Sequence, residues 1–173
     1  MQERGYCDVE VITTGCIVAP KGFKAGTTYC GIKIAKDSLD LGIIFSEYPA
    51  TGAALFTTNQ IYAAPVGLSK KIIQKGCVRA FIINSGNANA CTGEQGYKDA
   101  GEMLRIAAKY LKISADELLV ASTGIIGRPL PMDKIAIGIK TAAASLGNAP
   151  EHGNAMARAI MTTDTKQKDI AVK

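Results

Sequence analysis

The sequence predicts an α/β fold in which helices pack against a mixed β-sheet. Two observations carry this prediction. In the second half of the chain, short apolar runs alternate with longer segments whose apolar residues recur every three or four positions, as strands alternating with helices would. In the first third, short apolar runs follow one another directly, which is typical of antiparallel strands and favours a mixed sheet over a purely parallel one.

The first third is predicted to be mostly sheet. Residues 9–18 (VEVITTGCIV) are rich in β-branched side chains and predict a strand, and the proline and glycines of residues 19–26 (APKGFKAG) predict a turn or loop after it. Two further short apolar runs, over residues 39–47 and 52–60, are separated by YPATG. This pattern predicts a strand pair joined by a loop.

The middle of the chain predicts two helices around a buried strand. Residues 66–76 have helical apolar spacing and end at Gly76, and residues 77–84 (CVRAFIIN) form an apolar run. Residues 96–111 predict a long amphipathic helix that packs one face on the sheet. Its apolar side chains, spaced by three and four, are Ala100, Met103, Leu104, Ala107, Ala108 and Leu111.

The next segment repeats the order of strand, loop and helix. Ser114 and Glu117 have the spacing of a capping box, after which residues 118–121 return to a strand pattern. Pro131 suits the start of a helix. The buried face of that helix is predicted to be Met132, Ile135, Ile139, Ala143 and Leu146.

The C-terminal part predicts one more helix, over residues 151–160. The alternation of polar and apolar residues over 169–173 is typical of a strand, and we expect it to belong to a structure that continues past this point. A chain of 173 residues is long enough to bury a core of its own. We therefore expect residues 1–173 to form a single α/β domain.

The composition is that of a globular protein, with 47% hydrophobic and 20% charged residues. No apolar run reaches the roughly 18 residues of a membrane span, and the N-terminal MQERGYCDVE lacks the apolar core of a signal peptide. We therefore expect a cytoplasmic protein that binds no membrane. The net charge of +5 comes from scattered lysines, which disfavours nucleic-acid binding and fits a solvated surface or a mild preference for small anions.

Metal and disulfide chemistry are not expected, because the cysteines form no CxxC pair and His152 is the single histidine. Any histidine-based catalytic pair would need His152, whose polar setting (APEHGN) favours a surface position. Cys91 would gain reactivity from a following helix N-terminus, but its small neighbours and the lack of a nearby base favour a packed thiol. The cysteines, expected to be reduced, are Cys7, Cys16, Cys30, Cys77 and Cys91.

The segment over residues 122–124 (STG) is the best candidate for chemistry. A strand that ends in a small-residue turn exposes backbone N–H groups and a hydroxyl, and two such donors suit a developing oxyanion. Ser, Thr and Gly are also ordinary turn residues, and MTTDT (161–165) fits a helix end with hydroxyl caps. The sequence has no P-loop, HExxH or GxSxG motif, so the residues supply binding and stabilising groups without an attacking group.

Several long segments, in order, resemble one family. NSGNANACTGEQG, VASTGIIGRPLPMDKI and AIMTTDT, together with APKGFKAG and FTTNQIYAAPV, resemble the α chain of the bifunctional ornithine acetyltransferase / glutamate N-acetyltransferase (ArgJ) family of arginine biosynthesis. The likeness covers nearly the whole chain. It implies a DmpA/ArgJ-like α-β-β-α layered architecture that is completed by a separate β chain.

The resemblance also implies an activity. A cytoplasmic precursor cleaves itself before a threonine, and the α and β chains stay together as a heterotetramer of two of each. The N-terminal threonine of the β chain takes the acetyl group from N2-acetylornithine and passes it to L-glutamate by a ping-pong mechanism. Its own α-amine can serve as the base. No metal or organic cofactor is implied, and some members also accept acetyl-CoA.

Three positions match functional residues of the family. Thr123 and Gly124 match its oxyanion-stabilising pair, and Thr162 matches a substrate-binding position, whereas Thr163 and Asp164 are expected to shape the turn. The nucleophilic threonine is expected beyond residue 173. TTYCGIK (27–33) departs from the Gly- and Ala-rich stretch usual in the family, and we expect it to change packing locally without affecting the transfer chemistry.

Two alternatives remain open from the sequence. One is a subunit of an N-terminal-nucleophile aminopeptidase or amidase, which shares self-cleavage but passes the acyl group to water. The other is a non-catalytic module whose Asn and Thr loops hold a small polar metabolite. Use of glutamate as acceptor distinguishes the first from a transferase, and a longer reading frame with a Thr-initiated fragment excludes the second.

Overall fold

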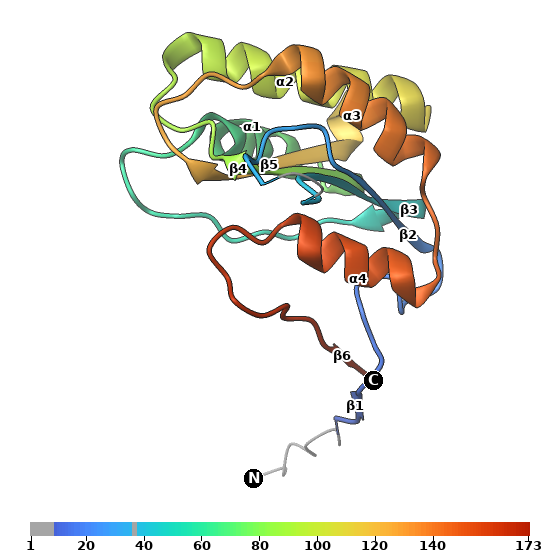
Figure 1. Ribbon diagram of the computed structural model, residues 1–173. Helices are drawn as coiled ribbons and strands as arrows, with labels where there is room; N and C mark the ends of the chain where they lie inside the picture. The colour runs from blue at the N-terminus through green and yellow to red at the C-terminus, as the bar shows by residue number, and fades with distance from the viewer. Residues whose placement is uncertain (1–8, 36–37) are drawn as a thin grey trace, which may run out of the picture.

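A four-stranded mixed sheet forms the centre of the molecule (Figure 1). The computed structural model describes residues 9–35 and 38–173. The strand order is β2-β3-β4-β5, with antiparallel pairing between the first three strands and parallel pairing between the last two. The strands are β2 (Phe23–Thr28), β3 (Leu41–Thr51), β4 (Cys77–Asn87) and β5 (Leu118–Ile125). The predicted mixed α/β fold is confirmed.

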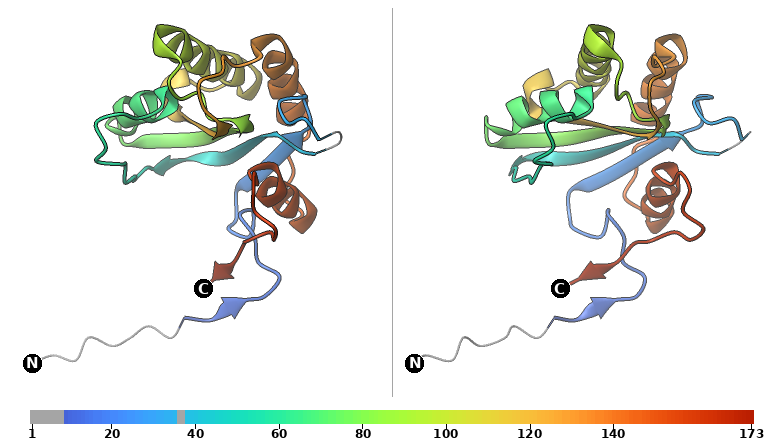
Figure 2. Two further views of the ribbon diagram at one scale, coloured as in Figure 1. Left: turned by 60° about the vertical axis from the view of Figure 1, so that its left-hand side comes forward. Right: turned by 90° about the vertical axis from the view of Figure 1, so that its left-hand side faces the viewer.

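Helices cover one face of this sheet fully and the other in part (Figure 2). The helices α1 (Ala64–Ile73), α2 (Gly93–Leu111) and α3 (Met132–Ala144) lie on one face, and α4 (Pro150–Ala159) packs on the opposite face against β2 and β3. A short 3-10 turn, η1 (Ala115–Glu117), precedes β5 and carries the predicted capping box. In the described part of the chain, no helix has the length and hydropathy needed to cross a bilayer.

The strands β1 (Val11–Ile12) and β6 (Ala171–Val172) form a separate antiparallel pair that joins the beginning and end of the described residues. Glu10 and Lys173 exchange two backbone hydrogen bonds at 2.9 and 3.0 Å next to this pair. The strand-like alternation of residues 169–173 thus forms a short strand, paired with the N-terminal segment.

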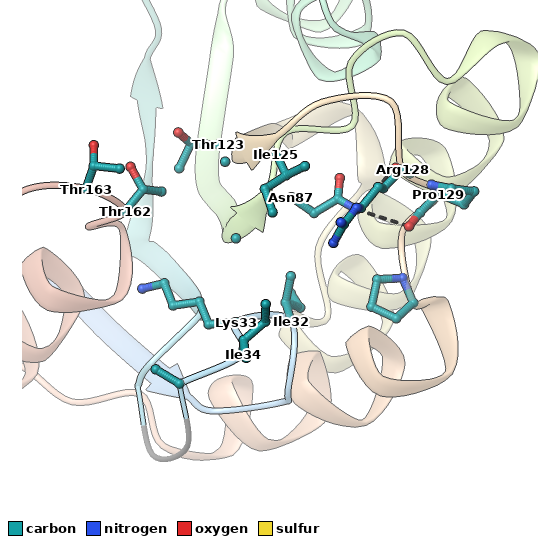
Figure 3. Close-up of a pocket in the computed structure, with 14 residues that line it drawn as sticks. Ile32, Lys33, Ile34, Asn87, Thr123, Ile125, Arg128, Pro129, Thr162 and Thr163 are labelled. Carbon is teal, nitrogen blue, oxygen red and sulfur yellow. Dashed lines mark hydrogen bonds between the residues drawn. The ribbon is translucent and has the colours of Figure 1, made fainter.

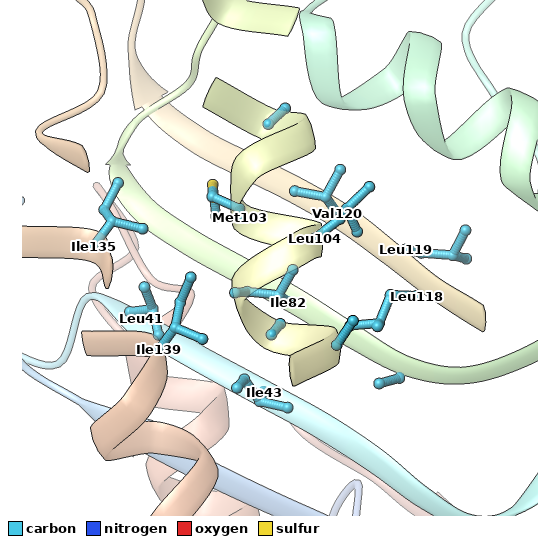
Figure 4. Packing of buried hydrophobic residues seen from close by; sticks show 14 of the residues in the cluster. Leu41, Ile43, Ile82, Met103, Leu104, Leu118, Leu119, Val120, Ile135 and Ile139 are labelled. Atoms are coloured by element: carbon cyan, nitrogen blue, oxygen red, sulfur yellow. The ribbon is translucent and has the colours of Figure 1, made fainter. Parts of the chain in front are cut away.

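The core lies between the sheet and the three helices (Figure 4). On α2, the face predicted from the sequence is buried, with Met103 and Ala107 fully inaccessible and Leu111 at the margin. On α3, Ile135 and Ile139 are fully buried and Ala143 packs half-buried against the core, as predicted, while Ala142, which was not predicted to belong to this face, is fully buried. The reason is close packing on β2, where a Cβ at Gly26 would lie 2.1 Å from the Ala142 carbonyl oxygen.

Two strand predictions in the first third are wrong. Residues 52–60 form no strand, because β3 runs on to Thr51 and the chain then crosses to α1 as an irregular segment. The strand expected over residues 9–18 shrinks to Val11–Ile12, and β2 forms within and beyond the predicted turn. Gly22, at φ +85°, makes a tight turn that lets β2 start immediately afterwards. The first eight residues, including Cys7, lie outside the described residues.

Replacing Ile82 with alanine tests the core. Ile82 is fully buried at the centre of β4, so Ile82→Ala should lower the free energy of unfolding by about 2–5 kcal/mol. Ile137, on the exposed side of α3, is 69% accessible, and Ile137→Ala should change the free energy of unfolding by about 0.5 kcal/mol or less. Urea denaturation of both variants compares them, and equal losses would contradict the assigned core.

Candidate active site

A cavity of about 740 Å³ opens at the edge of the sheet where β4 and β5 end (Figure 3). The three residues predicted as site residues, Thr123, Gly124 and Thr162, all line it. Thr123 and Gly124 come from the end of β5, and Thr162 follows α4 on the other side of the sheet. The fold thus brings together two motifs that are almost forty residues apart in the sequence.

Glycines allow the two strand ends to meet. Gly86 and Gly124 are paired across the parallel β4–β5 ladder, at φ +100° and +129°. A Cβ at Gly124 would lie 2.4 Å from the carbonyl carbon of Gly86 and 2.6 Å from the backbone nitrogen of Asn87. No side chain fits there, so the backbone beside Thr123 is held directly against the end of β4.

Asparagines at the end of β4 and directly after it hold the loop that follows β5. The Asn87 amide nitrogen donates to the carbonyl oxygens of Arg128 (3.2 Å) and Pro129 (3.0 Å), and its side-chain oxygen accepts from the Asn89 N–H (2.8 Å). Asn84 donates to the Asn87 carbonyl (2.8 Å) and accepts from the Ser122 hydroxyl (2.6 Å). All three asparagines are buried, so these bonds satisfy groups that water cannot reach.

Backbone contacts extend this support to the start of α2. Ala88 donates its N–H to the Ile125 carbonyl (2.9 Å), and Gly127 donates to the Ala90 carbonyl (2.8 Å). The Asn89 amide donates to the Gly96 carbonyl (2.8 Å) on the first turns of α2. The asparagine-rich segment of residues 81–96 is therefore a scaffold for the cavity wall.

The segment of residues 30–35 forms another wall, which the sequence reasoning did not identify. Ile32 and Lys33 line the cavity, and a Cβ at Gly86 would lie 3.1 Å from Lys33 Cγ. The last residues of TTYCGIK pack on the end of β4, and the expectation that this stretch leaves the transfer chemistry unaffected stays a prediction. The missed signal was Asp40, a lone acid at the start of the apolar run of β3, whose buried carboxylate binds this segment.

Neither Cys91 nor His152, the two other residues considered for catalysis, is among the residues described as lining this cavity. Cys91 is exposed in a left-handed conformation (φ 56°), so the expectation of a packed thiol is wrong. His152 lies on α4, where it packs against Gly147. Burial, with the Asp40 carboxylate adding to it, raises the pKa of the Cys30 thiol to about 12, so this cysteine stays protonated at neutral pH.

Comparison with known proteins identifies the family. The model of the ArgJ family matches residues 24–173. This chain belongs to the ArgJ family. The arginine biosynthesis bifunctional protein ArgJ of Dehalococcoides mccartyi is 45% identical over 166 residues, which are 95% of this chain and 40% of the relative. Its counterpart in Caldanaerobacter subterraneus is 50% identical over 162 residues, covering 94% of this chain and 39% of that protein. The chain thus spans about 40% of the length of these curated relatives.

Solved structures of the ArgJ family have the same fold. A crystal structure of arginine biosynthesis bifunctional protein ArgJ from Bacillus halodurans superposes with a TM-score of 0.87 at 39% identity, covering 92% of this chain and 82% of that one. Ornithine acetyltransferase from Mycobacterium tuberculosis, crystallised in complex with ornithine, gives a TM-score of 0.90 at 39% identity, with coverage of 95% and 88%. The mixed sheet and its helices are therefore the fold of this ArgJ family member.

Around Thr162, the neighbouring residues differ in role. Thr163 lines the cavity as well, although the sequence assigned it only to the turn. Asp164 is exposed and pairs with Lys168, whose hydrogen bond holds the pKa of the carboxyl below its usual range. Of these residues only the two threonines line the main cavity, and the role of Asp164 in shaping the turn stays a prediction.

The residues around the cavity can donate hydrogen bonds and positive charge. In the described ranges, no three His, Cys, Asp or Glu side chains are grouped so that they could hold a metal ion. The cavity offers the hydroxyls of Thr123 and Thr162, backbone donors of the β5 end, and the cations Lys33 and Arg128. This arrangement suits binding of a small anionic molecule and stabilisation of negative charge at an oxygen.

Glycine replacements test the close strand contact. Gly124→Ala places a Cβ against Gly86, whereas Gly127, at φ +74°, has open space around its Cβ position. Gly127→Ala should lower the free energy of unfolding by about 1–2 kcal/mol, because alanine is strained in the left-handed conformation. Gly124→Ala should lower the free energy of unfolding by about 1–3 kcal/mol more than Gly127→Ala does, because the cavity wall must move as well. Chemical denaturation of the two variants measures the difference, and similar losses would argue against the contact.

Proposed function

We propose that this chain is the α subunit of a glutamate N-acetyltransferase that moves an acetyl group from N2-acetylornithine to L-glutamate in arginine biosynthesis. The carrying observation is the cavity that collects Thr123, Gly124 and Thr162, the three positions matched to functional residues of the family. Family membership supports the activity, and the ornithine bound to the M. tuberculosis relative supports the substrate class. Acetyl-CoA is a candidate second donor, as in some members of the family.

In the proposed reaction, the hydroxyl of a β-chain N-terminal threonine attacks the acetyl carbonyl carbon, and its α-amine takes the proton. The carbonyl oxygen becomes an oxyanion that accepts hydrogen bonds from the Thr123 hydroxyl and the Gly124 N–H. Cleavage of the C–N bond releases ornithine with that proton and leaves an acetyl ester on the threonine. The amine of glutamate then attacks the ester, which regenerates the hydroxyl and forms N-acetylglutamate.

The sheet face opposite α1, α2 and α3 supports a β-chain partner. Helix α4 covers β2 and β3 on this face (Figure 2). Phe81, in the middle of β4, remains 38% exposed. Ile125 and Ile126, at the end of β5, are also exposed. An apolar sheet face needs a second layer to exclude water, and a β chain from the same precursor would supply it. We expect the pairs to assemble as a cytoplasmic heterotetramer.

Thr123→Val tests the oxyanion role. It removes the hydroxyl and keeps the side-chain volume, so kcat for acetyl transfer from N2-acetylornithine should fall about a hundredfold to a thousandfold with little change in KM. Thr123→Ser keeps a hydroxyl and should retain most of the activity. Steady-state kinetics of the enzyme with its β chain measure both variants. An unchanged kcat in Thr123→Val would remove Thr123 from the mechanism.

The matched control is the neighbouring hydroxyl of Ser122. Its Oγ donates to Asn84 at 2.6 Å, on the helix-covered side of the sheet. Ser122→Ala should therefore lower stability by about 0.5–1.5 kcal/mol, the usual net contribution of one hydrogen bond, without a comparable loss of kcat. Equal losses of kcat at both positions would indicate general damage to β5.

The maturation step has a direct test. The product of the complete gene should separate into two chains, and N-terminal sequencing should find threonine at the start of the second. Acetyl release from N2-acetylornithine should then depend on glutamate. Release at the same rate without glutamate would favour an aminopeptidase or amidase, and one intact chain without activity would favour a metabolite-binding module.

A further inference from the structure

The described residues of the cavity lining carry positive charge. Among the lining residues within 9–35 and 38–173, Lys33 and Arg128 are charged and none is Asp or Glu. Arg128 projects from the loop after β5, and Lys33 comes from the opposite wall (Figure 3). Such groups form charge-assisted hydrogen bonds with a carboxylate, and these are stronger than hydrogen bonds between neutral groups.

The ammonium group of Lys33 is held in a defined place. It donates to the Leu39 carbonyl at 2.7 Å and to the Ala159 carbonyl, at the end of α4, at 3.4 Å. An ammonium has three N–H donors, so a third remains for a ligand. Burial lowers the pKa of Lys33, and the nearby charge of Asp40 opposes this shift and favours the protonated form.

Lys33 also lies next to Thr162. Both residues line the main cavity and, in addition, a smaller one of about 350 Å³, which Arg158 and the exposed Asp164 also line. Figure 3 shows the Lys33 side chain extending toward Thr162. A ligand bound at Thr162 therefore comes within reach of the Lys33 ammonium.

Asp40 fixes the backbone that carries Lys33. Its fully buried carboxylate accepts hydrogen bonds from four consecutive backbone N–H groups, at distances of 2.8, 3.0, 2.6 and 3.1 Å. Those donors belong to Cys30, Gly31, Ile32 and Lys33. The Asp40 backbone carbonyl also accepts from the N–H of Ser85 on β4 (2.8 Å). One buried residue thus joins the Lys33 segment to the strand end at the cavity.

The geometry of the substrate also supports a carboxylate contact in this cavity. In an N2-acetylated amino acid, three bonds separate the acetyl carbonyl carbon from the carboxylate carbon, so the two lie within about 4 Å of each other. If Thr123 and Gly124 bind the acetyl oxygen, the α-carboxylate must also lie within this cavity. Lys33 is better placed than Arg128 to meet it, because Arg128 is exposed on a loop and Lys33 is already anchored beside Thr162.

We propose that the Lys33 ammonium binds the α-carboxylate of the acetylated amino-acid substrate, and that Asp40 is the positioning residue that holds Lys33 in place. This inference rests on the proposed acetyltransferase function and adds a recognition group to it. The carboxylate is common to N2-acetylornithine and glutamate, so the same contact serves both halves of the reaction.

A charged substrate and its uncharged analogue test the contact between Lys33 and the α-carboxylate. Steady-state kinetics of the complete enzyme are measured with N2-acetylornithine and with its α-carboxamide, which keeps the shape and loses the charge. The wild type should prefer the carboxylate in kcat/KM, and Lys33→Met should reduce this preference about 10- to 100-fold, mainly through KM for the carboxylate. Lys33→Arg, which keeps the charge, should retain part of the preference.

Matched variants separate recognition from folding. Lys134 donates to the Gly31 carbonyl (3.4 Å) on the same segment but lies outside the cavity, so Lys134→Met should keep the wild-type preference. Asp40→Asn replaces one acceptor oxygen with an NH2 group, which cannot accept hydrogen bonds from the four backbone N–H groups. It should therefore lower the preference for the carboxylate substrate, as Lys33→Met does. Asp99→Asn, at another buried acid, should not.

The outcomes distinguish the two levels of the proposal. A wild-type enzyme that transfers no acetyl group overturns the proposed function itself. An active enzyme whose Lys33→Met variant keeps the wild-type preference overturns only the role of Lys33. The same holds if Arg128→Gln alone abolishes the preference, because the carboxylate contact would then belong to Arg128.

Discussion

The contact between Gly86 and Gly124, at the ends of two parallel strands, is the constraint on which the site depends. Both glycines have positive φ values, and a single Cβ at Gly124 would overlap the backbone of β4. Ligands of sheets with parallel strands bind beyond the carboxyl ends of those strands. Only β4 and β5 are parallel in this sheet, so the topology offers one such place. The cavity lies there, beside the paired ends of β4 and β5.

Buried polar groups make this strand end rigid. A buried amide or carboxylate destabilises a fold unless hydrogen bonds replace its water contacts. Asn84, Asn87, Asn89 and Asp40 are all buried next to the cavity, and each is hydrogen-bonded. Most of their partners are backbone groups of the loops that form the walls. The cost of placing polar groups inside the fold is thus offset by bonds that hold those loops in one conformation, as a preorganised site requires.

The sequence predicted the parts of the fold that depend on local periodicity. The apolar face of α2, the capping box at Ser114 and the strand at the start of β5 follow from side-chain patterns within a few residues. It failed for β2, whose alternation is hidden by Lys24 and Gly26 and whose pairing depends on β3. It also failed for residues 52–60, where apolar side chains occur without a partner strand.

The candidate site likewise contains residues that the sequence could predict and residues that it could not. Thr123 and Gly124 could be found because a strand followed by small residues is a local signal, and the family resemblance matched them. Lys33 and Asp40 could not be found from the sequence, because their roles depend on contacts with backbone N–H and carbonyl groups, which every sequence has. A lone acid next to an apolar strand is the one trace that Asp40 leaves in the sequence.

The chemistry of the cavity explains why the proposed reaction needs a second chain. The lining residues that the structure describes include donors and cations but no carboxylate, cysteine or histidine that could act as a base. They can stabilise an oxyanion and bind a carboxylate, but neither role includes nucleophilic attack or removal of a proton. The uncovered sheet face around Phe81, in the middle of β4, belongs to the same two strands whose ends form the cavity. A partner layer that covers this face would exclude water there and could bring the nucleophile and its base to the cavity together. Charge stabilisation and attack would then come from two chains, with activity arising only on their association.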